Sequence, residues 1–263
     1  LQRAAPRYED YNFILQWAAR ELLERLGDIK RTFQNILILS PRQADSFERV
    51  FPDATVTILP YDALITDPED VLAAPLADEE GYDLILSIGD LHKVNDLPGV
   101  LICLRQMMKP DGVLMACFPG GETLRELRFS LMQAEIQTMG GASPRVLPFV
   151  DKQQMGALMQ RAGYALPVVD SETLHVSYRD IFHLMHDLRG MGETNCLQGR
   201  YKFITPTRLF FEAAQIYAKE SAEKDGRLPE SFEVIFTIGW APDESQQKPA
   251  KRGSGQVNLS EIL

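Results

Sequence analysis

Short, continuous apolar runs alternate along the chain with longer stretches in which apolar residues recur at helical spacing. Four runs, at residues 35–40, 54–59, 82–88 and 113–118, have the composition of strands buried on both faces of a parallel sheet. Between the runs at 82–88 and 113–118 we predict a helix that packs one apolar stripe on the sheet. The sequence KPDG after it is expected to end that helix. The alternation predicts an α/β fold with a crevice above the strand ends.

The rest of the chain follows the same two patterns. Helices are predicted at residues 11–26, 120–139, 151–162, 178–189 and 206–219, and further strands at residues 165–176 and 231–240. Glu122 is expected in the first turn of its helix, where it suits the helix dipole, and the final strand is expected to be the antiparallel edge of the sheet. Because nothing reads as an internal linker, we predict one domain over residues 1–240 and a polar tail at 241–263.

Composition narrows the class of protein. The chain has 263 residues, 45% of them hydrophobic, and a net charge of -10. No apolar run has the length of a membrane span, although a peripheral membrane contact stays open. The acidic balance argues against a nucleic-acid partner, which needs clustered Lys and Arg, and favours a protein partner with a basic surface. Three cysteines without a CxxC pair suit a reducing compartment such as the bacterial cytoplasm.

Residues that could take part in binding or catalysis follow the predicted strand at residues 82–88. Asp90 and His92 follow its carboxyl end, where a crevice is expected. His92 could act as a base or line a site, but an interior, hydrogen-bonded histidine explains it equally well.

Later segments add further candidates. In the polar loop 190–195, Glu193 and Asn195 could hydrogen-bond a guanidinium or an amide group. Arg128 either reaches a substrate pocket or forms ion pairs with neighbouring glutamates on a solvated face. His183 and His186 have helical spacing that could hold a metal, but the sequence positions no third ligand, so we predict no metal site.

Several motifs resemble a known family. The order YDLILS, LH and KPDG before a buried strand is similar to the second half of a class I S-adenosylmethionine-dependent methyltransferase domain. Five more resemble the branch that contains the mitochondrial complex I assembly factors, described as methyltransferases and as protein arginine hydroxylases, and their bacterial relatives. These are GGETLRELR from Gly120, RAGY from Arg161, GMGETN from Gly190, IGW from Ile238 and a segment ending in RGS at Ser254.

The resemblance implies a Rossmann-like, mostly parallel seven-stranded sheet with an antiparallel last strand and helical lid insertions at about 119–150 and 177–230. It also implies an S-adenosylmethionine site formed by Ser40, Asp62, Asp70, Ser87, Gly89 and His92. In the family a glycine-rich turn after the first strand lets the backbone approach the cofactor, but here that turn is SPRQA, at residues 40–44, without glycine. Pro60 replaces the ribose-binding acid, for which Asp62 could substitute, and Asp70 matches the acid that reaches the adenine.

Two functions are weighed. The missing glycines favour a methyltransferase-like protein with weakened or lost S-adenosylmethionine binding that binds a protein client. By resemblance this client is an iron–sulfur subunit of respiratory complex I. The alternative is an active methyltransferase or arginine hydroxylase, whose catalytic candidates are His92, Asp90, Arg128 and Glu193. Hydroxylation needs oxygen and electrons, and the sequence shows no iron triad or flavin motif to supply them. The expected location is the cytoplasm for a bacterial protein and the mitochondrial matrix for a eukaryotic one.

Overall fold

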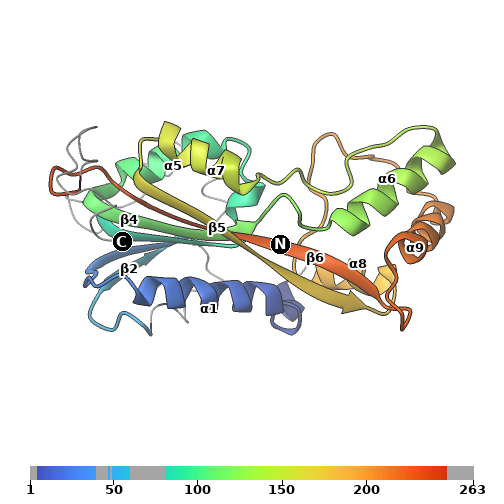
Figure 1. Ribbon diagram of the computed structural model, residues 1–263, viewed down its shortest axis with the longest axis horizontal. Coiled ribbons are helices and arrows are strands. Elements are labelled where there is room, and N and C mark those ends of the chain that lie inside the picture. Colours follow the sequence, from blue (N-terminus) through green and yellow to red (C-terminus); the bar gives the residue numbers. More distant parts are fainter. Residues whose placement is uncertain (1–4, 40–46, 48, 60–80, 248–263) are drawn as a thin grey trace, which may run out of the picture.

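One mostly parallel sheet runs through the computed structural model, which describes residues 5–39, 47, 49–59 and 81–247 (Figure 1). Neighbours from β2 to β4 pair in parallel, whereas β6 is antiparallel to both β4 and β5. The predicted Rossmann-like α/β fold is therefore confirmed. In pairing order the strands are β2 (Thr55–Ile58), β1 (Asn35–Leu39), β3 (Tyr82–Ile88), β4 (Met108–Pro119), β6 (Leu228–Trp240) and β5 (Ala165–Tyr178).

Helices cover both faces of this sheet. α1 (Phe13–Gly27) lies on one face, and α5 (Leu97–Gln106) and α7 (Lys152–Arg161) lie on the other (Figure 1). All seven residues of β3 are buried, as expected for a strand with both faces covered. Ile85 packs into the core with α5 and α7, while Leu84 and Leu86 pack into the core with α1.

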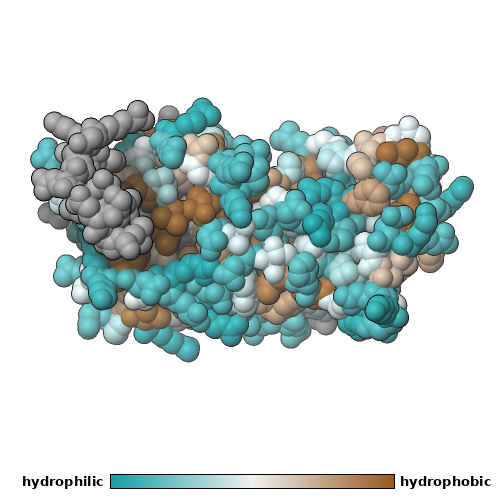
Figure 2. Space-filling view, viewed as in Figure 1, coloured by the Kyte–Doolittle hydropathy of each residue, from teal (hydrophilic) through white to brown (hydrophobic). Residues whose placement is uncertain are grey.

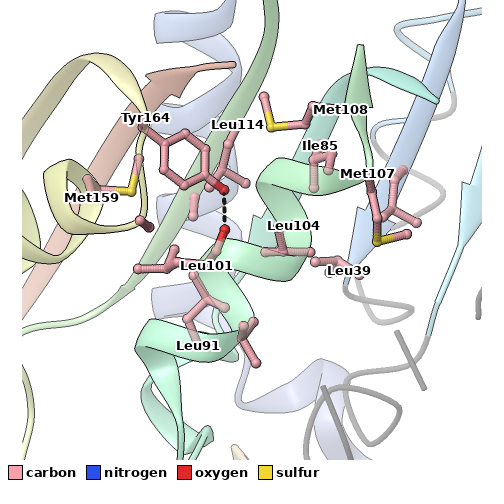
Figure 3. Close-up of a cluster of buried hydrophobic side chains, with 14 of the residues drawn as sticks. Leu39, Ile85, Leu91, Leu101, Leu104, Met107, Met108, Leu114, Met159 and Tyr164 are labelled. Atoms are coloured by element: carbon pink, nitrogen blue, oxygen red, sulfur yellow. Dashed lines mark hydrogen bonds between the residues drawn. The ribbon is translucent and has the colours of Figure 1, made fainter. Parts of the chain in front are cut away.

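Figure 3 shows the core on the side of α5 and α7. Tyr164 lies between Met159 and Leu101, and its hydroxyl donates a 2.9 Å hydrogen bond to the Leu101 backbone oxygen. This bond satisfies the polar end of a ring whose burial raises the pKa of Tyr164. Asp151 caps the start of α7, as predicted, and forms a capping box with Gln154.

β5 and β6 continue beyond the other strands, and three more helices pack around this extension (Figure 1). They are α6 (Arg125–Met139), α8 (Ile181–Gly190) and α9 (Thr207–Ser221), which fall within the predicted insertions. Leu131, Leu184 and Leu209 bring the three helices into one apolar core with Phe232 of β6. Figure 2 shows hydrophobic side chains exposed over α6, among hydrophilic ones.

The position of β6 corrects one prediction. This strand was expected at the edge of the sheet, but it lies between β4 and β5, because Val113 and Ala165 both pair with Trp240. Burial explains the arrangement: most residues of β6 are buried, whereas β5 alternates between exposed and half-buried positions, as an edge strand does. The described residues contain six of the seven strands expected.

Three helix boundaries also differ from prediction. The helix predicted to be ended by KPDG already ends at Gln106, and that sequence lies within β4. α6 begins at Arg125 because Leu124 has a left-handed backbone with φ 58°, so Glu122 lies outside the first turn. α8 begins three residues later than predicted, after Asp180 caps it.

The start of the polar tail contacts the domain. The Gln246 side chain donates hydrogen bonds to Asp111 at 2.9 Å and to the Ala241 backbone oxygen at 2.8 Å. Within the described residues, we find no helix of sufficient length and apolarity to cross a membrane.

Candidate functional site

The loop after β3 makes a close contact with α1. Gly89 follows the strand with φ 77°, and its backbone N–H donates to the Cys117 oxygen on β4 at 2.7 Å. A Cβ at this glycine would lie 2.2 Å from Cδ1 of Leu15. Only glycine therefore fits both the backbone conformation and the space between α1 and the strand ends.

A buried ionic network joins this loop to the loop after α8. Nε2 of His92 lies 3.0 Å from Oε2 of Glu193, and Nζ of Lys93 lies 2.6 Å from Oε1 of the same carboxylate. Lys93 also lies 3.7 Å from Asp90, whose side chain is buried. The His92 side chain is only 1% exposed, and its ring packs against Phe149. The network therefore ties two loops together at the strand ends.

The charge of Glu193 is stabilised by this network. Burial alone would raise the pKa of its carboxyl, but the charges of His92 and Lys93 and their hydrogen bonds outweigh burial and lower the pKa to about 2. Glu193 is thus an ionised acceptor at neutral pH. Both of its oxygens are already engaged, yet each carboxylate oxygen has two lone-pair directions and can accept a further hydrogen bond.

A cavity of about 120 Å³ opens beside Glu193. It lies between α1, the carboxyl ends of β3 and β4, α6, and the loops before α7 and after α8. Most of its wall is apolar, with Phe118, Phe149 and Phe232 among the aromatic residues. The wall also includes polar residues, namely Asn12, Thr123, Arg145, Glu193 and Asn195. An apolar cavity with a few placed polar groups is the usual form of a binding site.

The sequence did not reveal the role of Arg145. Its guanidinium makes two hydrogen bonds to the buried Glu135 of α6, at 2.8 and 3.0 Å, and a third to Thr205 at 3.3 Å. Asn195 holds the same loop by donating to the Pro144 oxygen at 2.8 Å. An arginine in a proline-punctuated loop gives no indication of a partner ten residues earlier on a helix, so pattern alone could not find it.

The structure separates the predicted site residues. It brings Asp90, His92 and Glu193 together, but Arg128 lies outside the cavity wall and donates to the Gly121 oxygen at 2.8 Å. The expected solvated ion pairs are made by its neighbour Arg125, with Glu122 and Glu126. The predicted cofactor residues Ser40, Asp62 and Asp70 lie outside the described residues.

The described candidates do not form an open cradle for S-adenosylmethionine. Ser87 is fully buried in the sheet, where its Oγ has no hydrogen-bond partner among the described residues. Leu15 covers Gly89, and His92 is held by Glu193 and Phe149. The assignment of these three residues to the cofactor stays a prediction.

A mostly parallel sheet, an antiparallel strand inserted before the last one, and a cavity at the strand ends define the class I methyltransferase fold. The chain is similar to a methyltransferase-like protein of Bacillus halodurans, with a TM-score of 0.53, 12% identity, and coverage of 84% of this chain and 99% of that one. It is also similar to YcgJ of Bacillus subtilis, with a TM-score of 0.50, 11% identity, and coverage of 86% and 99%. A model of the methyltransferase domain family matches residues 16–167.

Proteins of similar sequence place the chain in one branch of this superfamily. The mitochondrial arginine-hydroxylase NDUFAF5 of Danio rerio is 34% identical, over 96% of this chain and 82% of the relative, and that of Homo sapiens is 38% identical, over 98% and 78%. The malonyl-[acyl-carrier protein] O-methyltransferase of Xylella fastidiosa is 32% identical, over 91% and 85%. The chain belongs to the class I methyltransferase superfamily and, within it, to the branch of the NDUFAF5 proteins.

Proposed function

We propose that this chain binds a protein client, an iron–sulfur subunit of respiratory complex I, by holding an arginine side chain in the cavity beside Glu193. We further propose that its affinity for S-adenosylmethionine is weak or lost. The observation that carries the proposal is the ionised Glu193 carboxylate in the wall of an otherwise apolar cavity. A guanidinium is the side chain that best matches a carboxylate, because it donates parallel hydrogen bonds.

The other residues of the cavity would support this binding. His92 and Lys93 fix the position of the Glu193 oxygens, and Asn195 adds a polar group on the same loop. The aromatic wall would cover the aliphatic part of an arginine and exclude water, which strengthens the ionic contact. The name of the NDUFAF5 relatives, arginine-hydroxylase, supports arginine as the recognised side chain.

Two features support weak cofactor binding. Residues 40–44 lack the glycines that let a backbone approach S-adenosylmethionine, and Pro60 replaces a ribose-binding acid. Leu15 packs closely on Gly89, one of the residues that the resemblance assigns to the cofactor. The O-methyltransferase relative favours the alternative, an active methyltransferase, so cofactor binding decides between the two.

The cofactor is tested by calorimetric titration of S-adenosylmethionine and S-adenosylhomocysteine into the purified protein, with thermal unfolding as a second readout. We expect no heat and no rise in melting temperature up to millimolar ligand, because a ligand of the native state must stabilise it. Micromolar binding that is lost in Asp70→Ala would instead support an active enzyme.

The client is tested separately by titrating the iron–sulfur subunit of complex I into the parent protein and into Glu193→Gln. We expect the substitution to weaken binding at least about tenfold, since the amide has no negative charge and only one acceptor oxygen for the guanidinium. Glu122→Gln, on the exposed surface outside the cavity wall, is the matched control and should bind normally. Equal affinity of Glu193→Gln and the parent protein would refute the arginine site.

A further inference from the structure

We propose that Asn12, at the start of α1, is a second binding point in the cavity, where its side-chain amide pairs with the peptide backbone of the client. The inference rests on the proposed function, in which Glu193 holds the arginine side chain of that client. Asn12 adds a site for the backbone beside this arginine, so the cavity recognises an arginine within a polypeptide rather than a guanidinium alone.

Asn12 occupies the position at which asparagine usually caps a helix, but its side chain is not used in this way. A capping asparagine accepts a hydrogen bond from a backbone N–H two or three residues further on. The backbone of Asn12, with φ -83° and ψ 17°, is not extended, and its side chain makes no capping hydrogen bond. Its backbone oxygen still accepts from Gln16 at 2.8 Å, so α1 forms without the amide.

The amide of Asn12 is buried without a partner. The residue is 6% exposed and lies in the cavity wall, and its side chain makes no hydrogen bond to any residue that the structure describes. Leaving a buried amide without a hydrogen bond costs about 1–3 kcal/mol. Because buried polar groups are nearly always satisfied, an amide in the wall of a cavity is expected to bind whatever occupies that cavity.

The other polar groups named in the wall are already engaged within the protein. The Thr123 hydroxyl donates to a backbone oxygen of β6 at 2.7 Å. Both ends of the Asn195 amide are bound to backbone groups, at 2.8 and 3.1 Å. Arg145 is bound to a carboxylate of α6, at 2.8 and 3.0 Å. Of these polar wall residues, Asn12 and the remaining lone pairs of Glu193 are left for a ligand.

Charge and chemistry favour a peptide group over a guanidinium at Asn12. The N-terminus of a helix has a partial positive charge, which disfavours a cation and favours an oxygen acceptor. Asn12 lies at this end of α1, a helix of 15 residues. Its amide is neutral and offers a donor beside an acceptor. One residue of an extended chain presents its own N–H and C=O on the same side, so the two can form paired hydrogen bonds.

The start of α1 is fixed to the helix that leads to Glu193. The ring of Tyr11 packs so closely on Gly190, the last residue of α8, that a Cβ there would lie 2.3 Å from it. The same ring contacts that of His186 at 5.3 Å between centroids. Both binding points are thereby attached to the end of α8, and less conformational entropy is lost when a ligand bridges them.

The test is an NMR titration of the full chain with two probes. N-acetylarginine N-methylamide has an arginine side chain and peptide groups, whereas propylguanidine has no peptide group. Asn12→Leu, which is similar in shape, should weaken binding of the first probe about tenfold, because two hydrogen bonds are lost, and leave binding of propylguanidine unchanged. Glu193→Gln should weaken binding of both probes. Asn95→Leu, at an exposed position outside the cavity wall, is the matched control and should bind both normally.

Asn12→Asp is a second variant, which suits a helix N-terminus but lacks the donor, so it should also weaken binding of the arginine probe. Thermal unfolding checks that every variant is folded. Tighter binding of propylguanidine to Asn12→Asp would place the guanidinium at Asn12 and overturn the proposal. Equal effects of Asn12→Leu on both probes, or none on either, would also overturn it and leave the amide to water, while the Glu193 site stands. If the parent binds neither probe, or Glu193→Gln changes neither affinity, the proposed function fails and the Asn12 site with it.

Discussion

A buried glutamate under α9 should make the stability of this protein fall as pH rises. Glu230 of β6 is fully buried, and its Oε2 lies 2.5 Å from the Tyr217 hydroxyl, which is also 2.9 Å from the Pro229 backbone oxygen. A hydroxyl has one proton and cannot donate to both acceptors. A proton on Glu230 resolves this, because the carboxylic acid can donate while Tyr217 donates to Pro229.

The surroundings agree with a protonated Glu230. Burial and the neighbouring Glu126 of α6 raise the pKa of Glu230, the hydrogen bond from Tyr217 lowers it, and the net result is a pKa of about 8. Glu126 itself keeps its charge: burial opposes this, but Arg125 and Ser231 lower the pKa of Glu126. Tyr178, at the end of β5, also lies near Glu230 and Tyr217. Glu230 and Glu126 therefore share one negative charge at neutral pH.

The size of the effect on the free energy of unfolding follows from the difference in bound protons between the folded and the unfolded chain. Between the usual carboxyl pKa of 4.5 and about 8, the folded protein keeps a proton that the unfolded chain releases. The stabilisation is complete below the lower value and is lost as pH rises through the upper one. The free energy of unfolding should therefore decrease by ~1.4 kcal/mol per pH unit in this window. From a pH of about 5.5 to about 7.5, the loss is ~2.7 kcal/mol.

Urea unfolding of the parent protein and Glu230→Gln across this pH range measures the effect. The amide mimics the neutral acid, so the variant should lack this decrease while both proteins share every other titration. Glu220→Gln, at the exposed end of α9, is the control and should keep the slope of the parent protein. Equal slopes for Glu230→Gln and the parent would show that Glu230 is already ionised, and the proton count above would be wrong.

Two further substitutions test the packing of the site. Gly89→Ala should destabilise the fold by about 1–3 kcal/mol, because the added Cβ meets Leu15 and the backbone has a positive φ. In urea unfolding, a Leu15→Ala background should recover part of that loss, and the absence of any recovery would contradict the contact. Glu135→Gln should lower the free energy of unfolding by about 3–5 kcal/mol, since it leaves the guanidinium of Arg145 largely uncompensated. The control Glu122→Gln, at an exposed ion pair, should lower it by less than about 1 kcal/mol, and similar losses for the two variants would refute a buried ion pair.

The sequence predicted the elements better than it predicted their arrangement. Buried strands and amphipathic helices leave strong periodic patterns, so the fold class and most element positions were correct. The location of β6 inside the sheet depends on which strand it pairs with, and a pairing partner leaves no local pattern. For the same reason Glu193 was seen as a polar loop residue, while its contact with His92, 101 positions away, could be found only in the structure.

Candidate residues near the strand ends show the same limit. Asp90 and His92 follow the carboxyl end of β3, as the strand pattern predicts, but neither is in the cavity wall, and their role in a site stays a prediction. Arg128 was associated with a motif rather than with a position in space, and the structure shows Arg145 in the cavity wall instead. Side chains that act through partners distant in sequence are the ones that pattern reading misses.

The long pair of β5 and β6 has a mechanical consequence. β6 has 13 residues and therefore measures about 45 Å, and it is hydrogen-bonded to β5 over almost its whole length. The pair forms one rigid unit: its Leu228 end belongs to the core of α6, α8 and α9, and the rest of β6 contributes to the cores on the two faces of the sheet. A hinge between the core of α6, α8 and α9 and the cores on the sheet would have to break the hydrogen bonds between β5 and β6, so large rotations are disfavoured. Any widening of the cavity therefore has to come from the loops that flank it. The contacts of Glu193 with His92 and Lys93 hold two of these loops together and so oppose their separation.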